Sequence, residues 1–163
     1  MLERPVKTPC IGVCSTGIGD SVCRGCKRFA HEVIAWNSYT PEQKKVVDRR
    51  LGEFLSQCVS NKLRVTDKAL LLWQLQVQQL GFVSHHDEYC WVYSLIKAGA
   101  SQIVDTADYG FEIDLAFRHL SLAQLRELVD REFYILSEAH YDRYICLLYT
   151  SDAADENNPG EGG

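Results

Sequence analysis

The sequence contains no long hydrophobic run. Its densest apolar stretch, residues 69–75 (ALLLWQL), is far shorter than the roughly 18 residues of a membrane-spanning helix. The first ten residues also lack the apolar stretch of a secretory signal peptide. We therefore expect a cytoplasmic protein without membrane association, in a compartment that keeps thiols reduced. The seven cysteines, an odd number, cannot all pair in disulfides within one chain.

Enzyme signature motifs are missing as well. The sequence holds no P-loop, no G-x-G-x-x-G, no G-x-S-x-G and no H-E-x-x-H motif. The sequence therefore gives no support for a nucleotide-using or hydrolytic enzyme, and we expect a protein that is not an enzyme. With 46% apolar and 24% charged residues over 163 positions, the composition is that of a globular protein with a real core.

The charge is unevenly spread along the chain. Residues 1–58 carry nine Lys or Arg against six Asp or Glu, a net charge of +3, whereas residues 59–163 carry a net charge of −8. Nucleic-acid-binding modules are usually more basic than +3. The charge asymmetry is therefore only a mild indication of nucleic-acid binding.

Helical periodicity dominates most of the chain. A capping box of Thr40 and Gln43 starts one helix, with Pro41 in its first position, and Ser121 with Gln124 starts the longest helix. The sequence predicts a mainly α fold, in which an N-terminal four-cysteine metal-binding loop module precedes a small helical bundle. The predicted helices cover residues 28–36, 41–58, 66–81, 87–98 and 121–149, and two short strands are possible at 102–104 and 111–113.

Two domains and a tail are expected. Residues 1–58 form the cysteine loop plus two helices, residues 63–149 form a helical domain, and the polar residues 60–62 link them. The apolar stripe of the second helix consists of Val47, Leu51, Phe54, Leu55 and Cys58. The stripe of the third helix consists of Ala69, Leu72, Trp73, Val77 and Leu80, and it is widened by Leu70, Leu71 and Leu75. Trp36, Trp73 and Trp91 are expected in the core.

Residues 150–163 (TSDAADENNPGEGG) change character abruptly from the chain before them. They are acidic, polar and rich in glycine, so they are predicted to be disordered. The phrase CLLYTSDAADE also resembles read-through of a sequencing adaptor. We therefore expect this tail to be non-native, and it enters no functional argument.

Four cysteines lie within seventeen residues near the N-terminus. Cys10 and Cys14 form a C-x3-C pair, eight residues follow, and Cys23 and Cys26 form a C-x2-C pair. Two chelating pairs joined by a flexible loop can present four sulfurs to one ion in tetrahedral geometry. Gly25 gives the second pair the character of a metal-binding knuckle. The spacing strongly indicates a metal centre.

Cations flank the second pair and would offset the charge of such a centre. A divalent ion with four thiolates has a formal charge of −2, as does an oxidised iron–sulfur cluster with four thiolates. Arg24, Lys27 and Arg28 would compensate either of them. An iron–sulfur cluster and Zn²⁺ therefore remain equal possibilities as the cofactor. A redox pair at Cys23 and Cys26 is disfavoured because no strand–helix pattern precedes it.

The other thiols and the histidines have simpler interpretations. Cys58, Cys90 and Cys146 are expected to be small buried hydrophobic residues. His31 could replace a thiolate, although four cysteines already suffice. The run from His85 to Glu88 looks metal-like, but adjacent histidines point apart on regular structure, so a solvated helix start is expected. Glu138, His140 and Tyr141 could form an acid–base site, but His140 lies on an apolar stripe and is expected to be a core histidine.

The first third of the chain resembles a known family. The segment 8–51 is similar to the domain of unknown function 1289, whose bacterial members are labelled predicted iron–sulfur proteins. One departure from the family pattern is the stretch 29–31. The remainder looks like the C-terminal extension of longer gamma-proteobacterial members. The matching positions are Pro9, Cys10, Ile11, Val13, Cys14, Cys23, Gly25, Cys26, Arg28, Glu32, Val33, Trp36, Arg50 and Leu51. The resemblance implies a metal centre and supplies no reaction or substrate.

Three functions are compatible with these features. The leading hypothesis is a non-enzymatic metal-binding protein with a four-cysteine site and a helical body that binds an unknown protein partner. The second is an iron–sulfur redox or cluster-carrier protein. The third is a zinc-knuckle-like protein that binds nucleic acid or an acidic partner through a basic face. That face consists of Lys44, Lys45, Arg49 and Arg50, and such faces are more often simply solvated.

Overall fold

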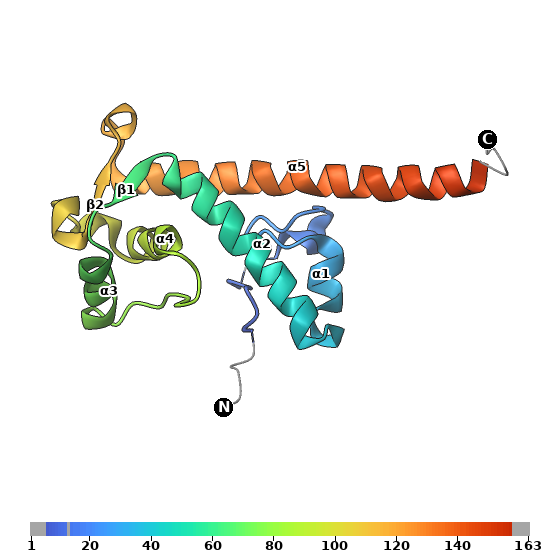
Figure 1. Cartoon of the computed structure of the whole chain (residues 1–163), viewed down its shortest axis with the longest axis horizontal. Helices are drawn as coiled ribbons and strands as arrows, with labels where there is room; N and C mark the ends of the chain where they lie inside the picture. Colours follow the sequence, from blue (N-terminus) through green and yellow to red (C-terminus); the bar gives the residue numbers. More distant parts are fainter. Residues whose placement is uncertain (1–5, 13, 158–163) are drawn as a thin grey trace. The chain divides into compact units, whose positions relative to one another are not determined.

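The computed structural model describes residues 6–12 and 14–157, with side chains as far as Ile145. Within this part the fold is mainly α-helical with one small antiparallel sheet, as predicted (Figure 1). The helices and strands are α1 (Ala30–Ala35), α2 (Pro41–Ser60), β1 (Leu63–Val65), α3 (Lys68–Val77), α4 (Glu88–Gly99), β2 (Phe111–Ile113) and α5 (Leu122–Asn157). The 3₁₀ helices are η1 (Ser15–Ile18), η2 (Trp36–Ser38), η3 (Ala100–Gln102), η4 (Thr106–Tyr109) and η5 (Leu115–Phe117). No helix among the described residues combines the length and the apolar character that a bilayer crossing requires.

The chain divides into two compact units. Among the described residues, the cysteine unit comprises 8–12, 14–37 and 134–157, and the helical unit comprises 6–7 and 38–133. Helix α5 contributes its first turns to the helical unit and its later turns to the cysteine unit. This division differs from the predicted one, because α2 groups with the residues that follow it and not with the cysteines.

Both predicted capping boxes are present. Thr40 Oγ1 accepts a hydrogen bond from the Gln43 backbone N–H at 3.1 Å, and Gln43 Oε1 accepts one from the Thr40 N–H at 2.8 Å. Ser121 and Gln124 make the same reciprocal pair at 3.1 and 2.9 Å. Each box satisfies two backbone N–H groups that the first helical turn leaves without partners. The starts of α2 and α5 therefore follow directly from local sequence.

The core of the helical unit is built from one face of each helix. The predicted face of α2 is largely confirmed, since Val47, Leu51 and Cys58 are buried. On α3 the central predicted stripe is wrong, since Trp73 is 55% exposed, and the fully buried residues are Leu71 and Leu75 from the widened part of the face. Almost every position from 69 to 75 is apolar, so periodicity alone does not decide which face of α3 packs against α4. Trp36 and Trp91 are buried as expected.

The two strands form an antiparallel pair in which Leu63 lies opposite Ile113 and Val65 lies opposite Phe111. The possible strand at 111–113 is confirmed. The one at 102–104 is not, because residues 100–102 form η3, and the partner strand β1 comes instead from residues 63–65, directly after the expected linker. Gly110 precedes β2 with φ +81°, and a Cβ there would lie 2.3 Å from the Asp67 carbonyl oxygen. This junction therefore requires glycine.

Two helix ends differ from the predicted ones. Helix α3 ends before Gln79, which adopts a left-handed conformation with φ 56°, and the Leu80 N–H donates to the Leu75 carbonyl oxygen at 3.0 Å. The predicted stop, Gly81, lies beyond this cap. Helix α5 continues to Asn157, into the tail that was predicted to be disordered from residue 150. That stretch has no glycine or proline before Pro159 to end the helix, and residues 158–163 lie outside the described part.

Candidate metal centre

The second cysteine pair lies in a tight hairpin-like turn. Val22 and Phe29 form an isolated antiparallel bridge, the Cys23 N–H donates to the Arg28 carbonyl oxygen at 2.9 Å, and the Lys27 N–H donates back to the Cys23 carbonyl oxygen at 2.8 Å. Lys27 adopts φ 67°, a conformation that usually favours glycine or asparagine. Its Nζ atom donates to the carbonyl oxygens of residues 24 and 25 at 2.6 and 3.2 Å, which holds the turn closed.

This turn surrounds the Cys23 sulfur with hydrogen-bond donors. Burial raises the pKa of the Cys23 thiol, but backbone N–H groups of Cys26, Ser15 and Gly25 donate to the sulfur, and the Cys26 side chain adds a further hydrogen bond. Together these donors lower the pKa of Cys23 to about 7. At neutral pH a large fraction of Cys23 is therefore thiolate, the form that binds metals.

The Cys26 sulfur lies beside a buried cation. Arg28 Nε donates to Cys26 Sγ at 3.3 Å, and the Arg28 guanidinium also lies over the Trp36 ring, 4.9 Å from its centroid. Burial raises the pKa of the Cys26 thiol, and Arg28 offsets only part of that increase. Cys23 and Cys26 are thus brought together as a pair with unequal acidities.

The first cysteine pair is exposed. The Gly12 N–H donates to Cys10 Sγ at 3.3 Å, and Cys14 Sγ lies 2.9 Å from Thr16 Oγ1. Ser15 ties this segment to the second pair. Its hydroxyl oxygen accepts from the Arg24 N–H at 2.8 Å, while its own N–H donates to Cys23. The residue that follows Cys14 therefore touches both the backbone and the sulfur of the second pair.

The four sulfurs do not converge on one point. Among the described residues, no three sulfurs of Cys10, Cys14, Cys23 and Cys26 form a group with all ligand atoms within 4.8 Å of one another. All four are free thiols. Cys58 and Cys90 are buried, as expected, and the side chain of Cys146 lies outside the described residues.

The family comparison covers this region. Residues 8–54 match the model of a family described as protein of unknown function (DUF1289). The resemblance noted in the sequence is confirmed, and we call residues 8–54 the DUF1289 segment. Comparisons with curated proteins and with solved structures found no match. The family description names no ligand or reaction, so the chemistry of the DUF1289 segment has to be argued from its residues.

The cations of the DUF1289 segment occupy different environments. Lys27 and Arg28 are buried beside the second cysteine pair. Arg24 points elsewhere: its side chain is exposed, pairs with Asp20 at 3.0 Å and lies over the Tyr134 ring. Two of the three predicted charge-compensating residues are therefore placed inside the fold next to the thiols.

The predicted basic face of α2 is not a continuous exposed surface. Arg49 is exposed, whereas Lys44, Lys45 and Arg50 are half-buried and make other interactions within the protein. A nucleic-acid backbone would need several solvent-facing cations along one track. The arrangement on α2 offers little of that kind.

The histidines and aromatic residues of the cysteine unit form a ring cluster. The Phe29 ring lies 5.2 to 6.4 Å from the rings of three residues on α5, and His31 stacks on Tyr144 at 6.0 Å. His140 belongs to this cluster but is exposed, so the expectation of a core histidine is wrong. It covers Phe29 from the surface of the unit. Glu138 hydrogen-bonds Tyr134 and is also exposed.

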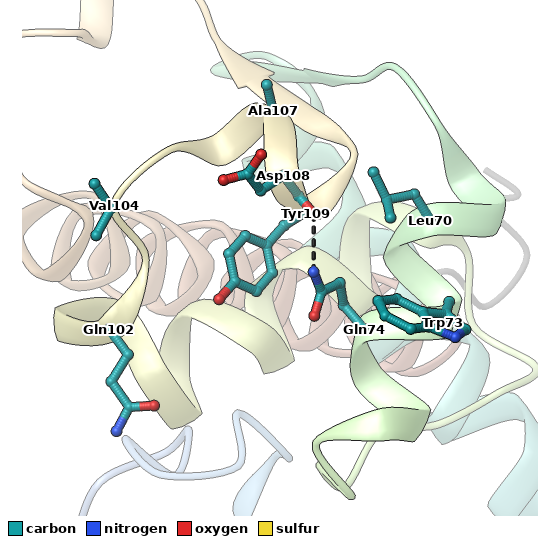
Figure 2. A pocket seen from close by; sticks show the side chains of 8 residues that line it. All are labelled: Leu70, Trp73, Gln74, Gln102, Val104, Ala107, Asp108 and Tyr109. Carbon is teal, nitrogen blue, oxygen red and sulfur yellow. Dashed lines mark hydrogen bonds between the residues drawn. The ribbon is translucent and has the colours of Figure 1, made fainter.

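A hollow of about 570 Å³ lies between α3 and η4 in the helical unit (Figure 2). Trp73 and Tyr109 line it, and Gln74 Nε2 donates to the Asp108 carbonyl oxygen at 2.9 Å. Asp108 carries the only ionisable carboxylate among its lining residues. Small-molecule sites usually have several convergent polar groups, so the hollow offers no catalytic constellation.

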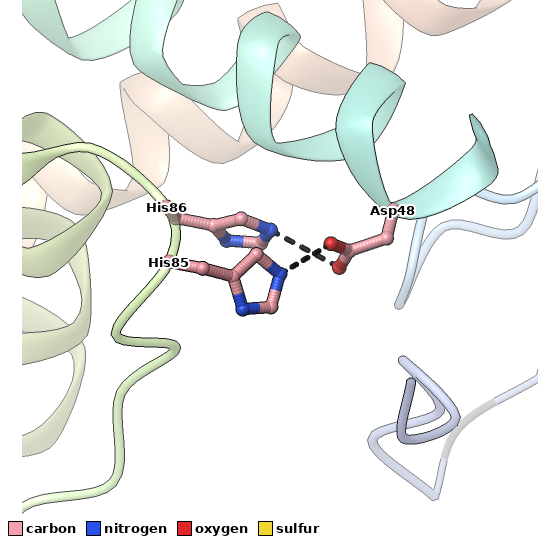
Figure 3. A group of neighbouring side chains, drawn as sticks. All are labelled: Asp48, His85 and His86. Carbon is pink, nitrogen blue, oxygen red and sulfur yellow. Dashed lines mark hydrogen bonds and ion pairs between the residues drawn. The ribbon is translucent and has the colours of Figure 1, made fainter. Parts of the chain in front are cut away.

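The sequence drew attention to His85 and His86 as metal-like but not to Asp48, and the structure brings the three together as possible metal ligands. The side chains of His85 and His86 point at the same carboxylate, that of Asp48 on α2 (Figure 3). The expectation that the two adjacent imidazoles diverge is wrong, because both residues lie in an irregular segment before α4. The signal that could have indicated this is that the histidines come immediately before Asp87, the N-cap of α4.

Proposed function

We propose that the cysteine unit binds one metal centre through Cys10, Cys14, Cys23 and Cys26, and that the protein acts through this centre as a non-enzymatic metal-binding protein. The observation that carries the proposal is the Cys23 sulfur, which is held by three backbone N–H donors with its pKa at about 7. Such N–H donors stabilise a thiolate whether or not a metal is present.

The charges around the second pair agree with this proposal. Lys27 and Arg28 are buried next to the thiols, where a four-thiolate centre would place its formal charge of −2. The centre would be an iron–sulfur cluster, which adds electron transfer, or Zn²⁺, which would stabilise a unit with a small core.

Binding requires the segment around Cys10 and Cys14 to move, since the four sulfurs do not yet converge. Both residues are exposed. Ser15 already anchors the chain next to Cys14 to the second pair. The movement is therefore a closure of an exposed loop onto a turn that is already formed.

The test is anaerobic purification followed by metal analysis and a visible spectrum. Iron, acid-labile sulfide and visible absorbance identify a cluster, whereas stoichiometric zinc in a colourless protein identifies a zinc site. Replacing Cys10, Cys14, Cys23 and Cys26 one at a time by Ser should abolish or strongly weaken metal binding. The matched control is Cys58→Ser, a buried thiol of the helical unit. Unchanged metal content in all four variants would refute the proposal.

A further inference from the structure

Asp48, His85 and His86 bring three metal-binding atoms together in the helical unit (Figure 3). His85 Nε2 lies 2.6 Å from one carboxylate oxygen of Asp48, and His86 Nε2 lies 3.0 Å from the other. The three ligand atoms all lie within 4.8 Å of one another. In a tetrahedral zinc site with ligands at about 2.0–2.1 Å, these atoms would be about 3.3 Å apart. Small side-chain movements therefore suffice to coordinate one ion.

The position of His86 is fixed by close packing on α2. Gly52 lies one helical turn after Asp48, and a Cβ at that position would be 2.9 Å from His86 Cδ2 and 3.1 Å from Nε2. Glycine inside a helix costs about 1 kcal/mol relative to alanine. The His86 imidazole occupies the space that this glycine leaves open, so the ring packs directly against the helix.

The segment that carries both histidines is also held in place. The His86 N–H donates to the Val83 carbonyl oxygen at 3.1 Å, and Trp91 Nε1 donates to the same oxygen at 3.2 Å. The next residue, Asp87, caps α4 and accepts a hydrogen bond from Ser56 of α2. The donors of the group therefore belong to a preorganised junction between α2 and α4.

The donor set suits a borderline divalent cation. Two imidazoles and one carboxylate are frequent ligands of zinc, and a water molecule can complete four-coordination. The His85 side chain is 62% exposed, whereas those of His86 and Asp48 are only 15% and 19% exposed. Solvent can thus reach the fourth position. A neutral imidazole can carry its proton on Nδ1, which leaves the Nε2 lone pair free for the ion.

We propose that Asp48, His85 and His86 form a second metal site, which binds Zn²⁺ and ties the segment before α4 to α2. This site is separate from the cysteine centre, since its three ligands all belong to the helical unit.

The test uses the full-length reduced protein, stripped of metal with a chelator and titrated with Co²⁺ and then with Zn²⁺. Asp48→Asn keeps the shape of the side chain and removes its charge, and His85→Ala alters an exposed residue, so both variants should fold. His119→Ala, an exposed histidine elsewhere in the helical unit, is the matched control. Circular dichroism verifies the fold of each variant.

The wild type and the His119→Ala variant should bind one Zn²⁺ more per chain than Asp48→Asn and His85→Ala. Because loss of a supporting residue alone weakens metal sites by about 10–100-fold, loss of a ligand should weaken this one by at least about tenfold. Zinc should also shift the imidazole NMR signals of His85 and His86. Equal zinc binding by all four proteins, or unshifted imidazole signals, would overturn the proposal.

Cobalt separates this proposal from the cysteine centre. Thiolate ligands give cobalt an intense charge-transfer absorption, whereas imidazole and carboxylate ligands give only weak visible bands. The charge-transfer absorption should remain in Asp48→Asn and His85→Ala. A wild-type protein without that absorption would contradict a zinc-type cysteine centre, while the zinc bound through Asp48, His85 and His86 would still be measured by the difference between wild type and variants.

Discussion

Gly52→Ala should destabilise the protein, although glycine-to-alanine changes inside helices normally stabilise. Position 52 lies well within α2, so alanine should gain about 1 kcal/mol of helix propensity. The new methyl group would lie 2.9, 3.1 and 3.3 Å from three atoms of the His86 ring. Overpacking of this kind costs about 1–3 kcal/mol. The net expectation is a loss of about 1 kcal/mol in the free energy of unfolding.

A double-mutant cycle makes the sign of this effect diagnostic. When His86 is first replaced by Ala, the space beside position 52 is open, and Gly52→Ala should then stabilise by about 1 kcal/mol. The coupling energy between the two positions is therefore about 2 kcal/mol, within the range for residues in direct contact. Urea unfolding in the presence of a chelator, with unchanged slopes, measures all four proteins without a contribution from bound metal.

The opposite result would refute the packing argument. If Gly52→Ala stabilises the wild type as much as it stabilises the His86→Ala protein, the ring does not rest on Gly52. The argument that packing on α2 holds His86 in position beside Asp48 would then fail. Pro41 to Ser60 would remain a helix in either case, so helical content by circular dichroism is the control that detects general misfolding.

Three other changes have defined outcomes. Glu132→Gln should lower the free energy of unfolding by about 1–3 kcal/mol in urea unfolding, because the Lys62 side chain is 1% exposed and would lose its ion-pair partner. Lys62→Met should lower the free energy of unfolding by less, because the Glu132 side chain reaches solvent. Burial raises the pKa of Tyr93 to about 12, so the folded state keeps the phenol proton after the unfolded chain has released it near pH 10. Stability should therefore fall between these pH values, and less so in Tyr93→Phe, as unfolding at stepped pH would show. Ser15→Ala should weaken zinc or iron binding about 10–100-fold in a competition titration, because Ser15 anchors the loop of the first cysteine pair, whereas the exposed Ser21→Ala should not.

The elements that local rules determine could be predicted from the sequence. The starts of α2 and α5 depend on capping boxes whose partners are three residues apart, and strand 111–113 follows a glycine that its turn requires. On α3 only a broad apolar face could be predicted, because seven of its ten residues are apolar and only the tertiary partner selects Leu71 and Leu75 among them. Strand β1 is similar: three residues have no periodicity of their own, and pairing with β2 defines them.

The candidate sites show the same distinction. The Cys23–Cys26 turn is visible in the sequence because its ligand spacing is local, and the structure adds the N–H donors that lower the pKa of Cys23. The contact of Asp48 with His85 and His86 was not visible in the sequence, because the two histidines lie 37 and 38 residues after Asp48. The contact between α2 and the segment before α4 forms only on folding, so no local sequence pattern predicts it.

The extent of the DUF1289 segment bears on how the two proposed centres relate. The segment ends at residue 54, so it contains all four cysteines together with Asp48 and Gly52, but neither of the two histidines. A chain that consisted of this segment alone could present the four thiols but would leave Asp48 without an imidazole. All four thiols of the proposed cysteine centre therefore lie within the matched segment. The proposed histidine site also needs residues that follow the segment, so the two proposed centres share no ligand and each can be removed and measured separately.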